Sequence, residues 1–562
     1  MPLFAPNAST NPINPPRPGD KKIALMGFHG GLNLKPSPLH VAEGQLTEIR
    51  NYRIVGSTAQ TQFGSSVLGG DLVATSPTSA PALLLFNFLN AAGTNNIVAV
   101  NSQRPYVYNA GGNSWDNLSG GADVFTGTDT DAWSDCVAAS DAAPGTLDAT
   151  LNLHVITNGI DAPRCWDGDT TDQYTVVNAN MPVCRYVAFF ANRVFAAHIG
   201  GNSTRVQWCV NGNITDWVGY GSGTLDRAGS GGYITGLREL RGNGILYYNN
   251  AIETITPIGQ TANTPVQFNQ SPGPGLGLLA PRSLKSLPSG EHIFLGSDFN
   301  VYIFDGSTPR PIGNDIAEDI RKRLNPSRVR NVCAMVVARD REYWLAIPQA
   351  ADATFASIVY IYNYEQNTWH RFFSPESITE LADATDPASV VTIGGLAGTI
   401  GSLSGTIGTL SGFPGASTKA LFGLQSGATN RVHQANYGSV QFGISATSIA
   451  GWIDTPASDY GSPGLRKTIT RVKIKYQDSS QVAGRLFLVG LHNGQELNLY
   501  TTETAELARL GDGTIKEAVA DLFYSGDSFG IRVQPLHTGV ATPEAFIVHG
   551  IEAHMLLGGN TF

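Results

Sequence analysis

From about residue 80 onward, short apolar or aromatic runs alternate with turns of glycine, asparagine and aspartate. These runs are rich in β-branched and aromatic side chains, which is typical of β-strands. Examples are 97–100, 187–197, 245–248, 301–304 and 343–347. Only two stretches favour helix: 315–324, where Ile316, Ile320 and Leu324 are four apart and Asn314 could cap the first turn, and 504–510. The pattern therefore predicts an all-β protein.

One internal repeat indicates how the strands are organised. Residues 106–115 (YVYNAGGNSW) align without gaps with residues 360–369 (YIYNYEQNTW), so that both tyrosines, both asparagines and the tryptophan coincide. A strand, a polar turn and a tryptophan on the return strand make a hairpin, and one hairpin cannot bury its aromatic face alone. Repeated hairpins stack around an axis. At ~45 residues per blade, residues 71–450 therefore predict a β-propeller of about six to eight blades.

The rest of the chain divides into three further parts. Residues 1–22 are rich in proline and read as an extended arm, and residues 23–70 form a segment that joins the β core. A low-complexity insertion is expected at 378–418, inside the propeller region. Residues 451–562 contain long alternating strands and predict a β-sandwich-like domain.

The insertion contains a seven-residue repeat, GTIGSLS followed directly by GTIGTLS, with no charged residue nearby. It is too rich in glycine for a stable isolated helix, so we expect a loop that packs against neighbouring copies. Our hypothesis is that it forms a gate or lumen loop. Its apolar anchors are Ile400, Leu403, Ile407 and Leu410.

Composition and charge narrow the classes of function. Hydrophobic residues make up 42% of the 562 residues, which excludes disorder for most of the chain, and charged residues only 14%, against ~25% in ordinary domains. The formal net charge of −9 does not suit a protein that grips nucleic acid through its phosphates. The first residues show no secretory signal, and the longest apolar stretch, 81–89, is too short for a membrane span. Five cysteines without a CxxC pair favour reduced, buried thiols in a cytoplasm.

Motifs that would indicate an enzyme are missing or lie in the wrong context. The sequence has no P-loop and no HExxH motif. One GxSxG match surrounds Ser528, but a strand-like run follows it where a nucleophile elbow needs a helix. We therefore predict no catalytic residues, no cofactor and no enzymatic activity.

Two clusters of aspartates offer oxygen ligands of the kind that calcium prefers. Neither matches the EF-hand pattern, and turn aspartates that bond to their own backbone explain both clusters equally well, so we predict no metal site. The six residues are Asp129, Asp131, Asp135, Asp167, Asp169 and Asp172.

Two basic clusters stand out against the acidic background. The first follows the predicted helix and fits a solvated helix C-terminus, and the second alternates along a strand, where charge on an edge would prevent unwanted pairing. The alternative for both is contact with an acidic partner or with DNA. The residues are Arg321, Lys322, Arg323, Arg328 and Arg330 in the first cluster, and Arg471, Lys473 and Lys475 in the second.

Several motifs, in order along residues 23–555, resemble the tail nozzle, or packaged-DNA stabilisation, proteins of short-tailed bacteriophages. The chain opens with FHGGLN at 28–33, although Gln62 and Phe63 stand where relatives often carry an arginine before Gly64. Three further stretches are similar to a propeller blade of that family: 280–283 (APRS), 301–306 (VYIFDG) and 312–316 (IGNDI). The glycine repeat resembles the TIDDL repeats of the family, with glycine and serine in place of the acidic residues. Two stretches, 452–456 (WIDTP) and 546–553, resemble its C-terminal domain.

The resemblance implies a structural virion protein in the phage tail, made in the bacterial cytoplasm. It would form a homohexameric ring below the portal and adaptor proteins and line the channel for double-stranded DNA, and tail fibres or spikes could attach to it. It would hold the packaged genome and allow its ejection. Two alternatives stay open: a glycan-binding or glycan-cleaving propeller, and a monomeric scaffold propeller.

Overall fold

The computed structural model describes most of the chain in segments. These are residues 20–35, 41–42, 44–71, 80–91, 93–148, 152–227, 229, 231–259, 265–270, 275–350, 354–385, 418–437, 439, 441–448, 451–456, 467–478, 484–492, 495–496, 503–506, 515–520, 524–526, 530–537 and 546–557.

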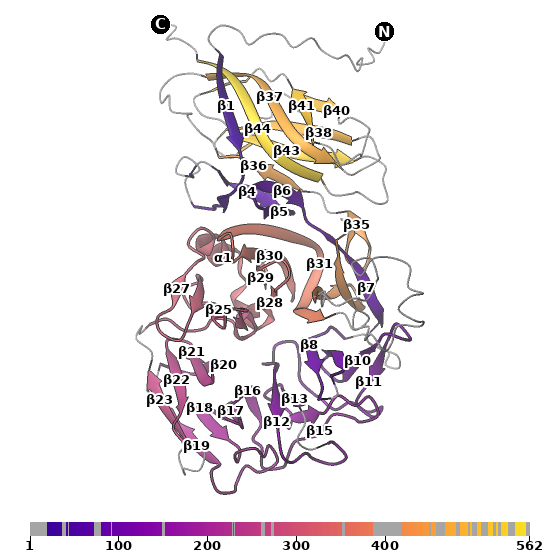
Figure 1. Ribbon diagram of the computed structural model, residues 1–562, viewed down its shortest axis with the longest axis vertical. Coiled ribbons are helices and arrows are strands. Elements are labelled where there is room, and N and C mark those ends of the chain that lie inside the picture. Colours follow the sequence, from indigo (N-terminus) through magenta and orange to yellow (C-terminus); the bar gives the residue numbers. More distant parts are fainter. Residues whose placement is uncertain are drawn as a thin grey trace, which may run out of the picture.

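The described part of residues 64–436 forms seven four-stranded antiparallel blades around one axis, which confirms the predicted propeller (Figure 1). In chain order, the first three blades are β8 (Leu84–Leu89), β9 (Asn95–Val100), β10 (Pro105–Asn109) and β11 (Ser114–Asn117); β12 (Ser134–Ala139), β13 (Asn152–Thr157), β14 (Arg164–Trp166) and β15 (Thr175–Val176); and β16 (Cys184–Phe190), β17 (Arg193–Ile199), β18 (Asn202–Trp208) and β19 (Gly223–Asp226). The next three are β20 (Ile234–Leu240), β21 (Asn243–Tyr248), β22 (Ile252–Pro257) and β23 (Val266–Gln270); β24 (Lys285–Ser286), β25 (His292–Leu295), β26 (Val301–Phe304) and β27 (Arg310–Pro311); and β28 (Cys333–Val337), β29 (Glu342–Ile347), β30 (Ala356–Asn363) and the first half of β31 (Thr368–Thr385).

The seventh blade is built from both ends of the propeller sequence. The second half of β31 is its inner strand and contacts the inner strands β28 and β8 on either side. β32 (Thr418–Ser426) and β33 (Thr429–Asn436) follow, and β7 (Gly64–Asp71), from the N-terminal part of the chain, pairs antiparallel with β33 as the outer strand. The N-terminal segment therefore closes the ring by hydrogen bonding.

The repeated hairpins occupy the same place in two blades, as the third and fourth strands. Tyr108 pairs with Trp115 in the first blade, and Tyr362 pairs with Trp369 in the sixth. Each tryptophan also donates its indole N–H to the outer part of the preceding blade, Trp115 to the Leu68 carbonyl at 3.0 Å and Trp369 to the Ile312 carbonyl at 2.9 Å. The repeat thus encodes both the hairpin and a link between blades.

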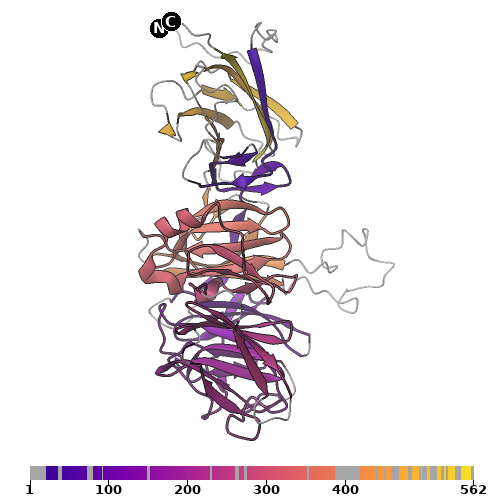
Figure 2. The ribbon, with the colours of Figure 1, turned by 90° about the vertical axis from the view of Figure 1, so that its left-hand side faces the viewer.

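A second, two-layered β unit sits beside the rim of the propeller and leaves its axis uncovered (Figure 2). One sheet contains β41 (Ile515–Ala520), β37 (Lys467–Asp478), β44 (Phe546–Leu557), β6 (Thr58–Thr61) and β5 (Tyr52–Val55), with β1 (Asp20–Met26) on β44 and β42 (Tyr524–Gly526) on β37. The other contains β4 (Glu48–Arg50), β36 (Trp452–Asp454), β43 (Gly530–His537), β38 (Gly484–His492), β39 (Gln495–Glu496) and β40 (Glu503–Glu506). The short pairs β2 (Gly31–Leu32) with β3 (Gln45–Leu46), and β34 (Gln441–Phe442) with β35 (Thr447–Ser448), complete the strands described.

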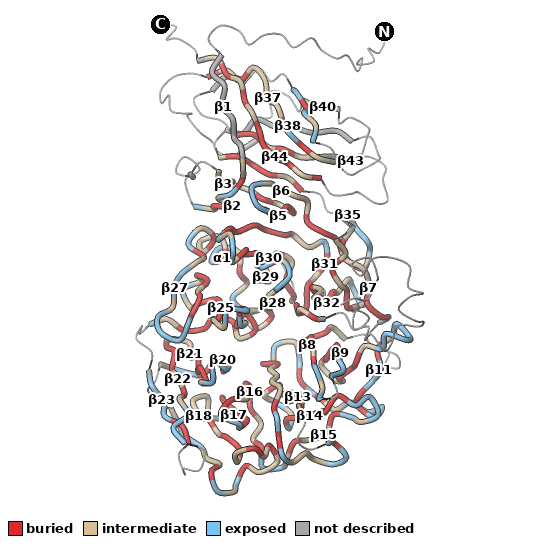
Figure 3. Tube along the Cα trace, in the orientation of Figure 1, coloured by how far each residue is buried: buried red, intermediate tan, exposed pale blue. Residues whose placement is uncertain are grey.

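This β-sandwich is a composite of the predicted C-terminal domain and the segment that precedes the propeller. Strands β1, β4, β5 and β6 lie before residue 62, yet they pair with β44, β36 and one another. Both sheets bury apolar side chains in one cluster, for example Tyr52, Ile453 and Val472, and that cluster continues into the fifth and sixth blades. In Figure 3 the buried stretches follow β37, β44 and β31, and exposed residues gather in the turns.

Three local expectations need correction. The predicted helix is present as α1 (Ala317–Arg323), but Ile316 stands at its N-cap, because the Asn314 side chain accepts a hydrogen bond from Asn300 instead. The described part of 504–510 lies in strand β40, paired with β38, since sheet pairing overrides a weak helix preference. Strand β31 also continues to Thr385, past residue 378 where the insertion was expected to begin.

Charged side chains join the sandwich to the sixth blade. Arg371 on β31 forms ion pairs with Glu48 on β4 and with Asp319 on α1, the latter at 2.7 Å. Asp319 also accepts hydrogen bonds from Tyr360 at 2.6 Å and from Arg323 at 2.9 Å. Burial alone would raise the pKa of Asp319, but Arg371, Tyr360 and Arg323 together outweigh it and lower that pKa.

The closing strand β7 offers a matched pair of substitutions. Leu68 is buried against Trp115, whereas its neighbour Val67 points outward and is 41% exposed. We expect Leu68→Asp to lower the free energy of unfolding by about 3 kcal/mol or more, because it buries an unpaired carboxylate at the ring closure. Val67→Asp should stay within about 0.5 kcal/mol. Urea denaturation followed by tryptophan fluorescence measures both, and equal effects would contradict the assigned closure.

The junction predicts a specific pH dependence. Because the pKa of Asp319 is lowered in the folded protein, its contribution to stability is present above the ordinary Asp pKa of about 3.9 and is lost as pH falls through the folded value. Asp319→Asn should cost about 1–3 kcal/mol at pH 7 and flatten the fall of the melting temperature between pH 5 and pH 2. The control is Asp226→Asn, which removes an exposed pair with Arg205 and should leave the melting curves nearly unchanged.

Candidate functional site

A cavity of about 360 Å³ lies on the propeller axis, between the inner strands of the blades. We call it the axial well. Its walls come from β8, β12, β16, β20 and β24, from the 3₁₀ turn η2 (Pro281–Ser283) before β24, and from Glu380 on β31. The inner strand of every blade begins at the same face of the propeller, which we call the first face. Glu239 and Ser286 stand near the ends of their inner strands and are exposed, so they mark the rim of the well at the opposite face.

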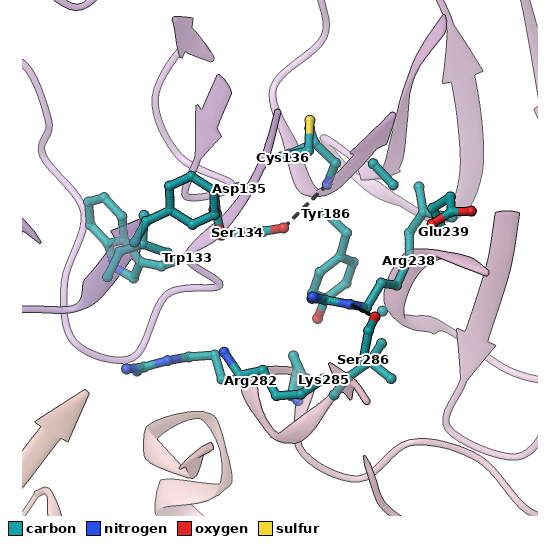
Figure 4. Close-up of a pocket in the computed structure, with 18 of the residues that line it drawn as sticks. Trp133, Ser134, Asp135, Cys136, Tyr186, Arg238, Glu239, Arg282, Lys285 and Ser286 are labelled. Carbon is teal, nitrogen blue, oxygen red and sulfur yellow. Dashed lines mark hydrogen bonds between the residues drawn. The ribbon is translucent and has the colours of Figure 1, made fainter. Parts of the chain in front are cut away.

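Three cations and three acids line the axial well. The cations are Arg238, Arg282 and Lys285, and the acids are Asp135, Glu239 and Glu380. In Figure 4, Arg282 and Lys285 lie along the lower side of the space and Arg238 extends toward it from the right.

The acids of the axial well are each engaged by a neighbour. Glu380 forms an ion pair with Arg282, and Asp135 lies 3.3 Å from His154 Nε2. Glu239 accepts a hydrogen bond from the backbone N–H of Gly242 at 2.5 Å. Paired carboxylates free to protonate a leaving group and activate water, as glycoside hydrolysis requires, are therefore not found among the described residues of the well.

The cations are less fully engaged. Arg238 donates from Nε to Ser286 Oγ at 2.8 Å, and its guanidinium end extends into the well (Figure 4). Burial lowers the pKa of Lys285, opposed by the charge of Glu380. Burial also lowers the pKa of Arg238, opposed by Asp135. Anything that supplies negative charge here would stabilise the charged forms of both side chains.

Asp135 connects the axial well to a buried hydrogen-bonded chain. His154 is fully buried, with Nδ1 2.6 Å from the Tyr174 hydroxyl and its ring stacked on Phe86 at a centroid distance of 4.3 Å. Burial raises the pKa of Tyr174 well above its ordinary value, so it stays protonated. This chain fixes the orientation of Asp135 and explains one of the predicted metal candidates as a structural group.

Two residues of the first basic cluster, Arg328 and Arg330, contact a loop on the far side of the propeller ring. The 3₁₀ segment η3 (Pro326–Asn331) precedes the sixth blade, yet Arg328 forms an ion pair with Asp129 at 3.1 Å and Arg330 donates to the Thr130 carbonyl at 2.9 Å. Asp129 and Thr130 belong to the loop that leads into the second blade. Because these blades are not neighbours, η3 reaches across the axis, and Arg328 and Arg330 serve this internal contact.

The other three residues of that cluster lie in the last turn of α1. Arg323 binds Asp319 in the junction, Lys322 pairs with Glu318 at 3.4 Å, and Arg321 donates to the Asp298 carbonyl at 3.0 Å. Lys322 remains largely exposed, with 67% of its side chain accessible. Of the cluster, only the helix surface around Arg321 and Lys322 is open to an acidic partner.

The second basic cluster lies on β37, where the predicted alternation holds and the predicted edge position is wrong. Val472, Ile474 and Tyr476 are buried. The strand itself lies between β44 on one side and β41 and β42 on the other, because N-terminal and C-terminal strands extend the sheet on both sides. Of the cationic face, Lys473 approaches Glu517 at 3.5 Å, Arg471 is half-buried and Lys475 is exposed.

The remaining aspartate candidates bond within their own turns or to neighbouring loops. Asp131 accepts from Thr128, Asp169 from Thr171, Asp172 from Thr146, and Asp167 from the backbone N–H groups of Asp148 and Asp169. Within the described residues, no group of three His, Cys, Asp or Glu side chains could hold a metal ion.

The residues Ile400, Leu403, Ile407 and Leu410 lie outside the described residues. All five cysteines are free thiols, and Cys136 alone lines the axial well. None of the helices in the described segments has the length and apolar character needed to span a membrane.

Sequence reasoning missed the three cations of the axial well. Arg238 and Lys285 stand in short, otherwise ordinary strand patterns, so nothing local marks them as axial. Arg282 lies in the APRS motif at 280–283, which was noted for its family resemblance and could have drawn attention to this position.

No protein-family model and no curated protein matches the chain. Among solved structures, the extracellular domain of a one-component system from B. thetaiotaomicron is 8% identical, with 88% of this chain and 63% of that chain covered and a TM-score of 0.38. A chain of the mitotic checkpoint complex is 9% identical, with 65% and 98% covered and a TM-score of 0.33. An exo-β-1,3-galactanase from Phanerochaete chrysosporium, solved with galactose, is 10% identical, with 87% and 100% covered and a TM-score of 0.25. The fold assignment therefore rests on the strand pairing of this chain itself.

Proposed function

We propose that the protein is a structural virion protein that forms a hexameric tail nozzle below the portal and adaptor. It would line the exit channel for double-stranded DNA, retain the packaged genome and allow its ejection. Because η3 reaches across the axis of each copy, the DNA channel of this proposal lies between the copies and not along a propeller axis.

The observation that carries this proposal is where the family-like motifs meet in space. Buried residues from six motifs in three separate parts of the sequence, with Phe28, Ala280, Ile316, Ile453 and Phe546 among them, belong to one apolar cluster. That cluster joins the sandwich to the fifth and sixth blades. Side chains packed in one core limit the residues that each neighbouring motif can carry. This supports the interpretation of the motifs, in their order along the chain, as a signature of the family.

Gly31, in the FHGGLN motif, illustrates how tight this core is. It has a φ of +64°, and a Cβ at this position would lie 2.8 Å from Thr368 Cβ and 3.0 Å from the Trp369 carbonyl oxygen. Both features require glycine. The motif therefore locks the N-terminal segment against the repeated tryptophan hairpin of the sixth blade.

The charge distribution gives further support. A channel wall that must release DNA should make few fixed phosphate contacts, since each one adds salt-dependent affinity. Among the described residues, five arginines of the first basic cluster and of the junction with the sandwich contact other residues of the same chain. They are Arg50, Arg323, Arg328, Arg330 and Arg371. These five side chains are therefore less available to hold a polyanion.

The first experiment measures the mass of the purified protein by light scattering, alone and after incubation with DNA-filled, tail-less heads. We expect about six copies of the 59.6 kDa chain in one particle, in solution or on the heads. A monomer that does not cosediment with heads would overturn the proposal. Retention of that monomer on a glycan column would favour the carbohydrate-binding alternative.

The gate hypothesis for the insertion has its own test. Thr385 and Thr418 face each other in the β31–β32 hairpin, so a two-residue Asn-Gly turn can replace residues 386–417 without breaking the blade. We expect particles that assemble normally but lose DNA on mild heating. A matched variant keeps the insertion and replaces Ile400, Leu403, Ile407 and Leu410 by serine.

The two insertion variants separate gating from assembly. DNA loss in both would assign retention to the apolar anchors, and loss only after deletion would assign it to the bulk of the insertion. Normal retention in both would show that the insertion is not the gate, while leaving the hexameric nozzle to be decided by the mass measurement.

A further inference from the structure

The axial well contains one buried and two half-buried cationic side chains whose donors are only partly used. Arg282 is 8% exposed, and although its Nη2 binds Glu380 and the Thr379 carbonyl, its Nε and Nη1 are buried without a hydrogen-bond partner in the described structure. For the half-buried Lys285, no hydrogen bond or ion pair of the side-chain ammonium group is found among the described residues. The half-buried Arg238 side chain makes a single hydrogen bond there, from Nε to Ser286.

Buried donors without acceptors are costly, and charged ones more so than neutral ones. The acids of the well do not remove this cost: Glu380 is already bound to Arg282, Asp135 faces His154, and Glu239 binds a backbone N–H at the rim. The unmet demand in this cavity is therefore for acceptor oxygens that carry negative charge.

The shape of the well fits a small ligand. Its volume of about 360 Å³ is at the lower end of the range typical of small-molecule sites. The exposed Glu239 and Ser286 lie at its rim, so a ligand would enter there.

We propose that the axial well binds a small anion that carries a phosphate group, held by Arg238, Arg282 and Lys285. Two guanidinium groups offer planar pairs of donors that match phosphate oxygens, and an ammonium group adds a compact third charge. The donors come from β20, η2 and β24, the inner parts of the fourth and fifth blades. The bound anion would join these blades to Glu380 and the closing seventh blade through Arg282.

This proposal does not depend on the nozzle function. A phosphate-binding well would add a ligand that stabilises each propeller, whether the protein is a ring or a monomer. The same chemistry is found in free inorganic phosphate and in phosphate monoesters, and the experiment distinguishes these two sources.

The test is isothermal titration calorimetry on the full chain at constant ionic strength, with inorganic phosphate, AMP and succinate as separate titrants. We expect saturable binding of phosphate or AMP at one site per chain, with the tighter of the two identifying the source. Lys285→Met should weaken this binding at least about tenfold, because it removes a charged donor. Lys285→Arg should retain most of it.

The matched control is Lys322→Met, which removes an exposed cation on α1, outside the well, and should leave the binding constant unchanged. Circular dichroism of every variant shows whether it has folded, and Arg238→Gln serves as the second well variant if Lys285→Met does not fold. Absence of saturable phosphate and AMP binding, binding of succinate alone, or equal affinities in the Lys285→Met and Lys322→Met variants would overturn the proposal.

Discussion

The closure of the propeller ring by β7 is the constraint on which the rest of the structure depends. Without β7, the seventh blade would lack its outer strand and the edge of β33 would be unpaired. The chain meets this requirement with a strand that precedes the whole propeller and pairs with β33. Residues more than 360 positions apart therefore have to meet before any blade is fully supported, as the register of Ser65 against Ala435 shows.

The same requirement explains why the sandwich and the propeller share one core. To reach the seventh blade, the N-terminal chain passes through the sandwich, where β4 and β6 pair with the C-terminal strands β36 and β44, and β5 pairs with β6. On the way, Arg53 forms an ion pair with the buried Glu342 of the sixth blade at 2.8 Å, and Glu48 binds Arg371. These pairs are strongly desolvated, so breaking one partner would leave an unpaired charge inside the protein.

The distribution of cations separates structural roles from available chemistry. The most conspicuous basic cluster in the sequence is largely consumed within the fold: Arg323 supports the junction, and Arg328 and Arg330 fix η3 across the axis. The less conspicuous cations Arg238, Arg282 and Lys285 line one cavity, where Nε and Nη1 of Arg282 have no hydrogen-bond partner among the described residues. A protein can thus have an acidic overall charge and still contain a site suited to an anion.

The sequence alone determined the local elements, because short runs of β-branched residues and a polar turn act over a few neighbouring positions. It predicted the all-β class, the two tryptophan hairpins, helix α1 and the alternation of β37. It could not show that residues before 62 complete the sandwich, that β37 is internal to its sheet, or that Arg328 contacts a turn across the axis. Only the tertiary structure decided these, together with the well and its three cations, since each depends on pairing between segments whose separation leaves no periodic trace in the sequence.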